Sequence, residues 1–477
     1  MPLYTDSVLP ILPLMVFLPF LAVIPIALAN ERHSHLISLA ISAIVFALTI
    51  FALYIAWQQG MPALAFTYNW LTQIGVNLSL QFTNLSLILV LMTSIVFLAA
   101  AIVNAYFIPK DRKLYGVIFM LVEGGTLGLF LSGNLFLFYV FWEIAEFAMF
   151  FIIYAYGGYD RRYAAIKFIL YSIAASLLLL IGIMLFYAYA HTFDISALAQ
   201  SAGTIPAAIQ ATIMVLLLAA FMIKAPIFPF HNWLPDAHTE APTTGSMILA
   251  GVLLKFGGYG LLLMFLLLPI AANYAPYIAA IFGFSAIYGA LVAMRQTHLK
   301  RMIAYTSIVD MGIIAIGIAA INHFGTSGAV YGMLAHGLAI SLLFLLAGTI
   351  DKVYGTLMVD KLKGLAETTP KIVYLFIFGI LAAVGLPLTS GFIGDLLIFI
   401  GSFSTFGVAG LIPIAAILIV GAYFFWVVEK SFFGIKNKSD AYSLSGRSVV
   451  VSSSFLVLFT VLLGIVPLIL LSLSTFS

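Results

Sequence analysis

Uncharged apolar runs of about 20 residues recur from one end of the chain to the other, with short polar connections between them. An α-helix rises about 1.5 Å per residue, so a run of that length crosses the roughly 30 Å hydrocarbon layer of a membrane. The pattern predicts an all-α polytopic membrane protein with about fourteen transmembrane helices. These helices are expected at residues 8–29, 36–57, 84–106, 115–133, 135–156, 164–190, 206–234, 243–269, 276–294, 302–320, 326–350, 371–402, 408–430 and 449–474.

Two connections have a different pattern. Apolar and polar positions alternate along residues 65–70 and again along 78–82, with turn residues near Ile74-Gly-Val-Asn between them. This alternation within Gly60 to Thr83 predicts a short β-hairpin on one membrane face. The segment from Asp194 to Gly203 is a polar connector with room for a surface helix.

Two of the predicted spans are interrupted near their middle. The seventh contains Lys224-Ala-Pro-Ile-Phe-Pro, and the twelfth contains Gly385-Leu-Pro followed by Asp395. Proline removes a backbone donor and breaks a helix, so each span is expected to be discontinuous beside one charge. The two interrupted spans are an odd number of spans apart along the chain. The blocks of helices around them therefore have opposite orientations in the membrane. Paired broken helices in inverted repeats are typical of transport proteins with a path at the midplane.

This organisation divides the chain into four parts. We expect three helices and the hairpin in residues 1–110, a first five-helix repeat in 111–270, a second inverted repeat in 271–432, and a last helix in 433–477. The broken helices would be numbers 7 and 12, one in each repeat.

Basic residues test the topology independently of hydropathy. The loop residues Arg32, Lys110, Arg112, Lys113, Arg161, Arg162, Arg295, Lys300, Arg301, Lys352, Lys361, Lys363, Lys371, Lys430, Lys436, Lys438 and Arg447 all follow odd-numbered spans. Positively charged loops face the cytoplasm, so both termini are expected outside it. The localisation that we predict is a prokaryotic cell membrane, which the chain crosses several times.

Composition excludes several functional classes. Of 477 residues, 64% are apolar and 8% are charged, which is more apolar surface than a soluble core hides. A net charge of +3 without basic runs gives no indication of nucleic-acid binding. The chain has no cysteine, so it cannot hold a thiolate-bound iron–sulfur cluster, and any redox centre is expected on another chain. No basic region precedes the first apolar run, so no cleavable signal peptide is expected.

Ionisable side chains nevertheless occur at depth in the predicted membrane layer. Each charge at a helix centre costs roughly 2.5–3.5 kcal/mol, so such groups are expected to face the protein interior. They are Glu123 in the fourth span, Glu143 and Glu146 in the fifth, Lys224 in the seventh, Lys255 in the eighth, Asp310 in the tenth, His336 in the eleventh and Asp395 in the twelfth.

A row of this kind is suited to moving protons. Burial disfavours the charged form of a lysine and of a carboxylate, so either group becomes able to exchange a proton near neutral pH. A neighbouring opposite charge has the reverse effect. Moving the Glu143 carboxylate toward Lys224 would therefore favour protonation of the lysine, and moving it away would favour loss of that proton. We interpret these two residues as a switch made from one ion pair.

Structural roles are open for several of these residues. Glu143 and Lys224 could form a static buried pair that fixes helix packing. We favour the switch because Lys255 and His336, both without an evident partner, are expected at similar depth. His336 could instead bond a neighbouring carbonyl. Asp310 and Glu123 could line a packing contact, and Glu146, one turn beyond Glu143, could stabilise the same pair.

The polar residues at the predicted cytoplasmic end of the seventh span also have a structural interpretation. A helix-capping role is favoured for the set His231, Trp233, Asp236, His238 and Glu240. No metal site is expected, because the two histidines are seven residues apart without a supporting cluster. The sequence Gly257-Gly-Tyr-Gly is better explained by close helix packing than by a phosphate-binding loop.

Long motifs give the chain a resemblance to a known family. The segment Phe230-His-Asn-Trp-Leu-Pro-Asp-Ala-His-Thr-Glu-Ala-Pro-Thr-Thr-Gly-Ser, with Phe141-Trp-Glu, Tyr163-Ala-Ala-Ile-Lys-Phe and Leu299-Lys-Arg-Met-Ile-Ala-Tyr-Thr-Ser, resembles the chain M family of antiporter-like subunits in respiratory complex I, the NADH-quinone oxidoreductases. It is similar to mitochondrial subunit four of the same complex, and the resemblance covers nearly the whole chain. The family has fourteen spans in two inverted repeats and pumps protons, while quinone, flavin and iron–sulfur clusters lie on partner subunits.

The resemblance also assigns roles. It implies that Glu143 and Lys224 form the switching pair, that Lys255 relays, and that Asp395 passes the proton to the outer side. Chain M carries glutamate at the Asp395 position and the sister chains L and N usually carry lysine. Relatives commonly have histidine where this chain has Asp310, so the carboxylate would substitute for it. The printed sequence ends soon after the fourteenth span, so a lateral helix like that of chain L is not expected.

The first functional hypothesis is therefore a proton-translocating membrane-arm subunit of a complex I-like quinone oxidoreductase. Such a chain would act as part of an enzyme that oxidises NADH or another donor, with chains of the L and N type as neighbours. The alternatives are a subunit of a multi-chain Na⁺/H⁺ antiporter and the membrane arm of an energy-converting hydrogenase. The motif from Phe230 to Glu240 favours the first hypothesis.

Overall fold

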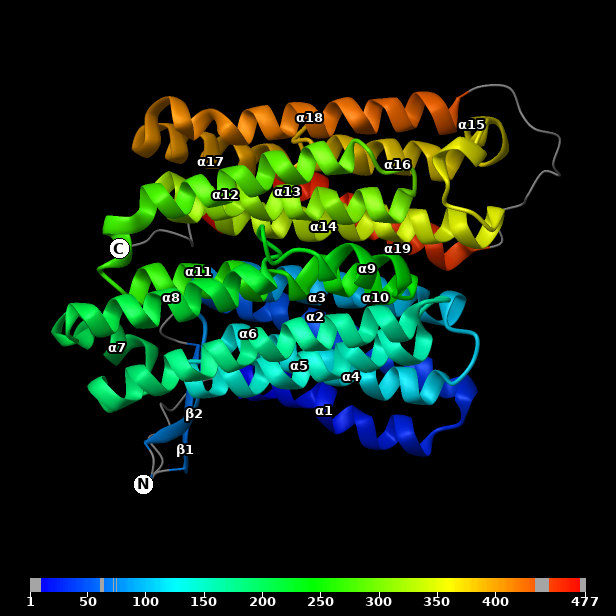
Figure 1. Cartoon of the computed structure of the whole chain (residues 1–477). Coiled ribbons are helices and arrows are strands. Elements are labelled where there is room, and N and C mark those ends of the chain that lie inside the picture. The colour runs from blue at the N-terminus through cyan, green and yellow to red at the C-terminus, as the bar shows by residue number, and fades with distance from the viewer. Residues whose placement is uncertain (1–9, 61–63, 72, 74, 434–445, 472–477) are drawn as a thin grey trace.

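Long helices running side by side make up most of the molecule (Figure 1). The computed structural model describes residues 10–60, 64–71, 73, 75–433 and 446–471. Within these residues, 13 helices are long and apolar enough to cross a membrane. One of them, Ser390–Phe432, has 43 residues and contains two helices and a turn, which is enough chain to cross twice. The chain is therefore a multi-pass membrane protein, and the prediction of an all-α polytopic fold is confirmed.

The helices have the following bounds. The first half of the chain forms α1 (Ile11–Leu28), α2 (Glu31–Gln59), α3 (Asn84–Phe107), α4 (Arg112–Leu131), α5 (Leu135–Tyr156), α6 (Arg161–Ala190), α7 (Ile195–Ser201), α8 (Ala207–Lys224), α9 (Trp233–Glu240), α10 (Thr243–Ile248) and α11 (Lys255–Leu267). The second half forms α12 (Ala271–Ala293), α13 (Leu299–Ala319), α14 (His323–Tyr354), α15 (Leu365–Thr368), α16 (Pro370–Ala383), α17 (Ser390–Phe406), α18 (Ile412–Val427), α19 (Arg447–Ile465) and α20 (Leu468–Leu471).

The predicted hairpin is present. Strand β1 (Ala65–Leu71) pairs antiparallel with β2 (Val76–Gln81), and Ala65 lies opposite Gln81. The hairpin and the surface helix α7 lie at the same end of the bundle (Figure 1). Several predictions fall outside the described residues: the turn at Ile74, both chain termini, the outermost residues of the first and last spans, and the loop lysines Lys436 and Lys438.

Both predicted helix breaks are confirmed. Helix α8 ends at Lys224, and the chain continues through Pro226 and Pro229 before α9 begins. Helix α16 ends at Ala383, and α17 begins after a turn in which Gly385 has a φ of 75°. Glycine adopts that left-handed conformation without the steric cost that a side chain would add. Each break follows from the residues that interrupt the apolar run.

A third interruption was not predicted. The π-helical segment Leu249–Leu253 separates α10 from α11, and the predicted eighth span is therefore not one regular helix. A π-helical turn accommodates an extra residue, which apolar periodicity does not reveal.

The two halves of the chain repeat one local arrangement. The amide of Leu135 bonds the Phe193 carbonyl at 2.9 Å, and the amide of Leu299 bonds the Leu357 carbonyl at the same length. The number of positions from Leu135 to Leu299 equals the number from Phe193 to Leu357. By this constant interval, α5 and α6 correspond to α13 and α14. Helix α7 follows the first contact and α15 follows the second, and they lie at opposite ends of the bundle (Figure 1). An inverted repeat produces this arrangement.

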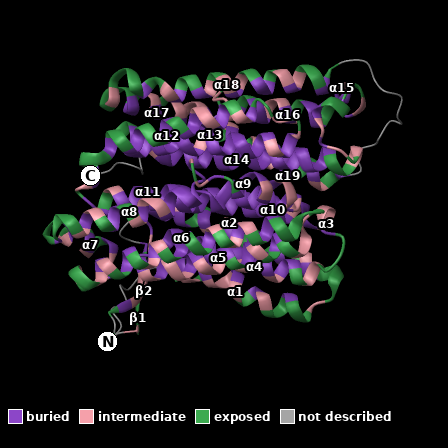
Figure 2. Ribbon diagram, in the orientation of Figure 1, coloured by how far each residue is buried: buried purple, intermediate pink, exposed green. Residues whose placement is uncertain are grey.

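The centre of the bundle is formed by α14 and its neighbours. All residues in the most apolar 18-residue stretch of α14 are buried, whereas 28% of the residues in the corresponding stretch of α2 are. Figure 2 shows the same gradient, with buried residues concentrated in the middle layer. Polar side chains within that stretch of α14 are enclosed by protein, and they have to find partners on the surrounding helices.

Candidate functional site

Lys224, the last residue of α8, is buried at the first helix break and forms an ion pair with Glu146 of α5. Both side chains are almost completely hidden, with relative exposures of 1% and 2%. The prediction that Glu143 is the partner is therefore wrong for this arrangement. Glu146 lies one turn beyond Glu143 on α5, about 4.5 Å further along the helix axis. This position places its carboxylate at the level of the Lys224 ammonium group.

Glu143 lies beside this ion pair without joining it. Its side chain is half-buried, and its Oε1 atom has no hydrogen-bond partner among the described residues. Tyr139, one turn earlier on α5, is its polar neighbour. Two carboxylates one turn apart thus face the region of a single buried lysine.

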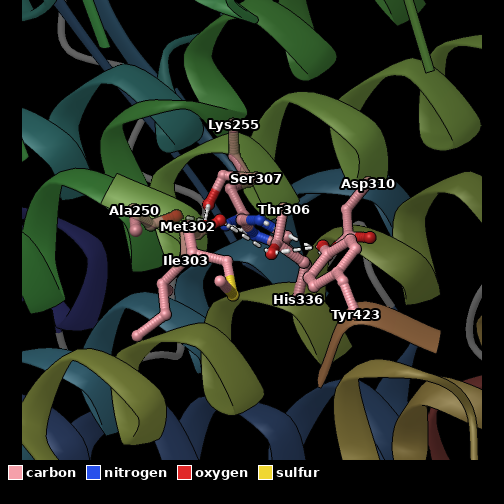
Figure 3. A network of polar contacts seen from close by, with 9 residues as sticks. All are labelled: Ala250, Lys255, Met302, Ile303, Thr306, Ser307, Asp310, His336 and Tyr423. Carbon is pink, nitrogen blue, oxygen red and sulfur yellow. Dashed lines mark hydrogen bonds and ion pairs between the residues drawn. The ribbon is translucent and has the colours of Figure 1, made fainter. Parts of the chain in front are cut away.

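A second buried cation begins α11. The Nζ atom of Lys255 donates to the Ala250 carbonyl at 2.5 Å and contacts Nδ1 of His336 at 2.6 Å (Figure 3). Ala250 belongs to the π-helical segment before α11. The prediction that Lys255 and His336 lack partners is wrong, since they bond each other, and His336 bonds a lysine rather than a backbone carbonyl.

His336 connects Lys255 to an acid. Its second ring nitrogen, Nε2, lies 3.8 Å from Oδ2 of Asp310. The three groups come from α11, α14 and α13, and Figure 3 shows them converging between these helices. An imidazole that contacts a donor on one nitrogen and an acid near the other can accept a proton on one side and release it on the other.

The row continues to the second helix break through a small cavity. Asp310, His336 and Asp395 line one cavity of about 20 Å³, which has room for one water molecule. Asp395 lies on α17, and its carboxylate packs against the break itself, because a Cβ atom on Gly385 would come within 2.6 Å of Oδ2. The structure therefore brings Lys255, His336, Asp310 and Asp395 together.

Glu123 lies apart from this row. It is fully buried on α4, and its Oε2 accepts a hydrogen bond of 2.7 Å from Ser42 of α2. This contact joins two helices, as expected for the packing role that the sequence left open.

Sequence reasoning missed one polar contact beside the row. The hydroxyls of Thr306 on α13 and Tyr423 on α18 lie 2.7 Å apart (Figure 3). Tyr423 is fully buried within an apolar helix, where no spacing distinguishes it from a packing residue. Only the position of α18 against α13 reveals the pair.

The polar residues of the connection after α8 make mainly structural contacts. The Trp233 indole donates to the Ile223 carbonyl at 2.9 Å and holds α9 against the end of α8. Asp236 lies 2.7 Å from Lys167 of α6 and 3.3 Å from Arg301 of α13, so it connects the two repeats. These contacts agree with the structural interpretation of this segment.

The remaining members of that set are a carboxylate and two histidines. Glu240 accepts from the Asp160 amide at 2.9 Å. His231 and His238 are buried, and their ring nitrogens have no hydrogen-bond partner among the described residues. His238 stacks on Phe344, with ring centroids 4.5 Å apart. No group of three or more potential metal ligands occurs in the described part of the chain.

The glycine run on α11 packs as predicted. A Cβ atom on Gly257 would collide with the backbone nitrogen of Ala225, and one on Gly260 would collide with the Phe221 ring. The run therefore allows α11 to approach α8 closely, and this contact brings the helices that carry Lys224 and Lys255 together.

Comparisons with known proteins give one consistent result. A family model described as NADH:quinone oxidoreductase/Mrp antiporter, TM, matches residues 132–420. The NADH-quinone oxidoreductase subunit M of Rickettsia felis is 36% identical over 477 residues, with 96% of both chains covered. An NAD(P)H-quinone oxidoreductase chain 4 from a Synechococcus strain is 39% identical over 440 residues, covering 90% of this chain and 83% of the relative.

Solved structures are similar over nearly the whole chain. A chain of respiratory complex I from Thermus thermophilus has a TM-score of 0.89 at 27% identity, covering 97% of this chain and 98% of that one. A chain of the Mrp complex from Dietzia has a TM-score of 0.87 at 21% identity, covering 98% and 96%. The archaeal membrane-bound sulfane sulfur reductase gives 0.89 at 21%, with the same coverage. The last two likenesses concern the fold alone.

Proposed function

This chain belongs to the NADH:quinone oxidoreductase/Mrp antiporter transmembrane family, and we propose that it is a proton-translocating membrane-arm subunit of a complex I-like quinone oxidoreductase. The relatives at 36% and 39% identity are subunits of such enzymes. The chain would then act as one part of a translocase, with quinone, flavin and iron–sulfur clusters on partner subunits. Antiporter-like chains of the L and N type would be its membrane neighbours.

The observation that carries this proposal is the buried row of ionisable groups at the helix breaks. The first break holds the Lys224–Glu146 pair, and Lys255, His336 and Asp310 follow between α11, α14 and α13. Ionisable groups inside a membrane protein are costly, and they mark ion or proton paths when they face a protein interior. The cavity beside Asp395 would extend the row to the second break.

The ion pair at the first break would act as the switch. Opposite charges favour the charged form of both partners, so contact with Glu146 holds a proton on Lys224. Separating the pair leaves the lysine in a dry site, where its charged form is less favoured and its proton can pass to the next acceptor. Glu143, one turn away with an unpartnered oxygen, is the second carboxylate to which Lys224 would turn. Both carboxylates therefore belong to the proposed switch.

The test is proton pumping by the purified complex in vesicles. Lys224→Ala is expected to abolish pumping while the complex still assembles, and Lys255→Ala should cause a smaller but clear loss. Lys361→Ala, at an exposed loop position, is the matched control and should pump normally. Electron transfer that stays coupled at the full proton stoichiometry in Lys224→Ala would contradict the proposal.

Orientation and chain divisions form part of the same proposal. The loops rich in lysine and arginine would face the cytoplasm of a prokaryotic cell, with both termini outside it. The two repeats would extend over 111–270 and 271–432. The chain of the Mrp complex shares this fold, so the antiporter alternative is compatible with it, and the named sequence relatives favour the quinone oxidoreductase over both alternatives.

A further inference from the structure

Four aromatic rings surround the Lys224 ammonium group. Measured from Nζ, the ring centroids of Phe168, Phe256, Trp142 and Trp233 lie at 5.3, 5.5, 5.7 and 5.9 Å. A cation within about 6 Å of a ring is attracted by the negative face of the π-system. The rings come from α6, α11, α5 and α9, so the lysine is enclosed from four helices. We call these four rings the cage.

The cage is a fixed arrangement. Trp142 packs on Phe256 with centroids 5.5 Å apart, and Phe168 packs on Trp233 at 5.4 Å. All four side chains are at most 2% exposed. The indole of Trp233 is further held by its bond to the Ile223 carbonyl. Rings that support one another in this way keep their position when a charged partner of the lysine moves.

The second repeat lacks rings at the two positions that correspond to Trp142 and Phe168. Thr306 takes the place of Trp142 and Gly332 that of Phe168, by the constant interval that relates α5 and α6 to α13 and α14. If the rings were required only for helix packing, aromatic residues would be expected at these positions in both repeats. The rings instead accompany Lys224, which indicates that they serve its charge.

We propose that the cage holds the proton on Lys224 while Glu146 is displaced, so that the lysine keeps its charge until it reaches its next acceptor. This inference rests on the proposed proton translocation. The four residues are positioning residues, since they act through Lys224 and exchange no proton themselves. Among the described residues, the charged groups that act on Lys224 are Glu143 and Glu146 on α5. Lys167 on α6, next to Phe168 in the chain, is bound to Asp236.

The physical reason is the dryness of the site. Water cannot solvate the ammonium group once the carboxylate has moved away, and the charged form then depends on whatever attraction remains. Ring faces supply such an attraction without providing a base, and it is stronger out of water than in it. A carboxylate in the same place would take the proton back, whereas an aromatic ring cannot.

Fluorination of Trp142 tests this proposal. Adding fluorine withdraws electron density from the ring face and weakens the attraction while leaving the shape nearly unchanged. We expect a series of mono-, di- and trifluorotryptophan at position 142 to move the alkaline limb of the pumping–pH profile to lower pH in steps. The most fluorinated ring should shift its midpoint by about 0.5 pH unit.

The same series at Trp57, a tryptophan 68% exposed on α2, is the control and should leave the profile unchanged. The proposed role of the cage is contradicted if the midpoint of the alkaline limb does not fall as fluorines are added at position 142. It is also contradicted if the midpoint moves equally for the Trp57 series. Lys224→Ala separates the two proposals: retained pumping in that variant contradicts proton translocation through Lys224, whereas lost pumping with an unmoved fluorine series contradicts the cage alone.

Discussion

At the scale of single residues, the two buried lysines differ in what holds their charge. Lys224 has a carboxylate partner, so removing that partner leaves an uncompensated charge. Lys255 has an imidazole and a backbone carbonyl, which are neutral acceptors at hydrogen-bond distance. A proton can pass from Lys255 to His336 without separating an ion pair, whereas discharge of Lys224 requires one to open. The slower, regulated step is therefore expected at Lys224.

Replacing each carboxylate of α5 separates its two roles. Glu146→Gln breaks a buried ion pair and should lower the free energy of unfolding by roughly 3–5 kcal/mol. Glu143→Gln breaks no ion pair in this structure and should leave stability nearly unchanged. Both variants are expected to lose pumping, because the lysine then has one carboxylate instead of two.

Thermal unfolding of the purified complex and pumping in vesicles measure these two effects. Equal loss of stability in the two variants would contradict the assigned pairing. Normal pumping in Glu143→Gln would remove that residue from the switch.

The choice between Glu143 and Glu146 shows what the sequence could not decide. Both carboxylates lie on one face of α5, and the hydrophobic pattern places them at similar depth. The partner of Lys224 depends on the height of α8 against α5, which is set by packing across the break. For the same reason the bond between Lys255 and His336 was invisible in sequence, although both residues were identified as buried and ionisable.

At the scale of secondary-structure elements, apolar runs predicted the helices well because each long helix has to match the membrane thickness. Proline and glycine predicted both broken helices, since those residues act locally. The π-helical segment Leu249–Leu253 was missed because its residues continue the apolar run and include no proline. The segment ends two residues before Lys255 and supplies the Ala250 carbonyl that accepts a hydrogen bond from the ammonium group.

Close packing of α11 on α8 can be tested with one methyl group. Gly257→Ala would force a Cβ atom into the Ala225 backbone, and overpacking of this kind costs roughly 1–3 kcal/mol. Gly421→Ala is the matched control, because a Cβ atom there meets no neighbour, and alanine should stabilise α18 by about 0.5–1 kcal/mol.

The melting temperature of the complex should therefore fall for Gly257→Ala and stay constant or rise for Gly421→Ala. A fall in both variants would show that these helices tolerate no added volume and that the glycine run has no special role.

At the scale of the whole molecule, two inverted copies of one fold place similar structures at opposite membrane faces. The basic loops then decide which face is which. Tyr159, 98% exposed in the loop after α5, is expected in the cytoplasm, and Val408, 81% exposed in the turn between α17 and α18, is expected outside. The chain has no cysteine, so single cysteines at these positions can be followed without background from the chain itself.

A membrane-impermeant maleimide added to sealed, right-side-out cells should therefore modify Val408→Cys and spare Tyr159→Cys. Broken cells should show both modifications, as detected on peptides of this chain by mass spectrometry. The reverse result in sealed cells would contradict the orientation of the whole bundle.

The small cavity between Asp310, His336 and Asp395 would also set a size limit on what travels along the proposed row. A sodium ion moves only with a full set of coordinating oxygens, and a space of about 20 Å³ accommodates a single water molecule. A proton needs no such shell, because it passes along hydrogen bonds. Ion selectivity would then arise from crowding rather than from a dedicated binding site, and the number of ions pumped per electron should be the same in sodium-containing and sodium-free media.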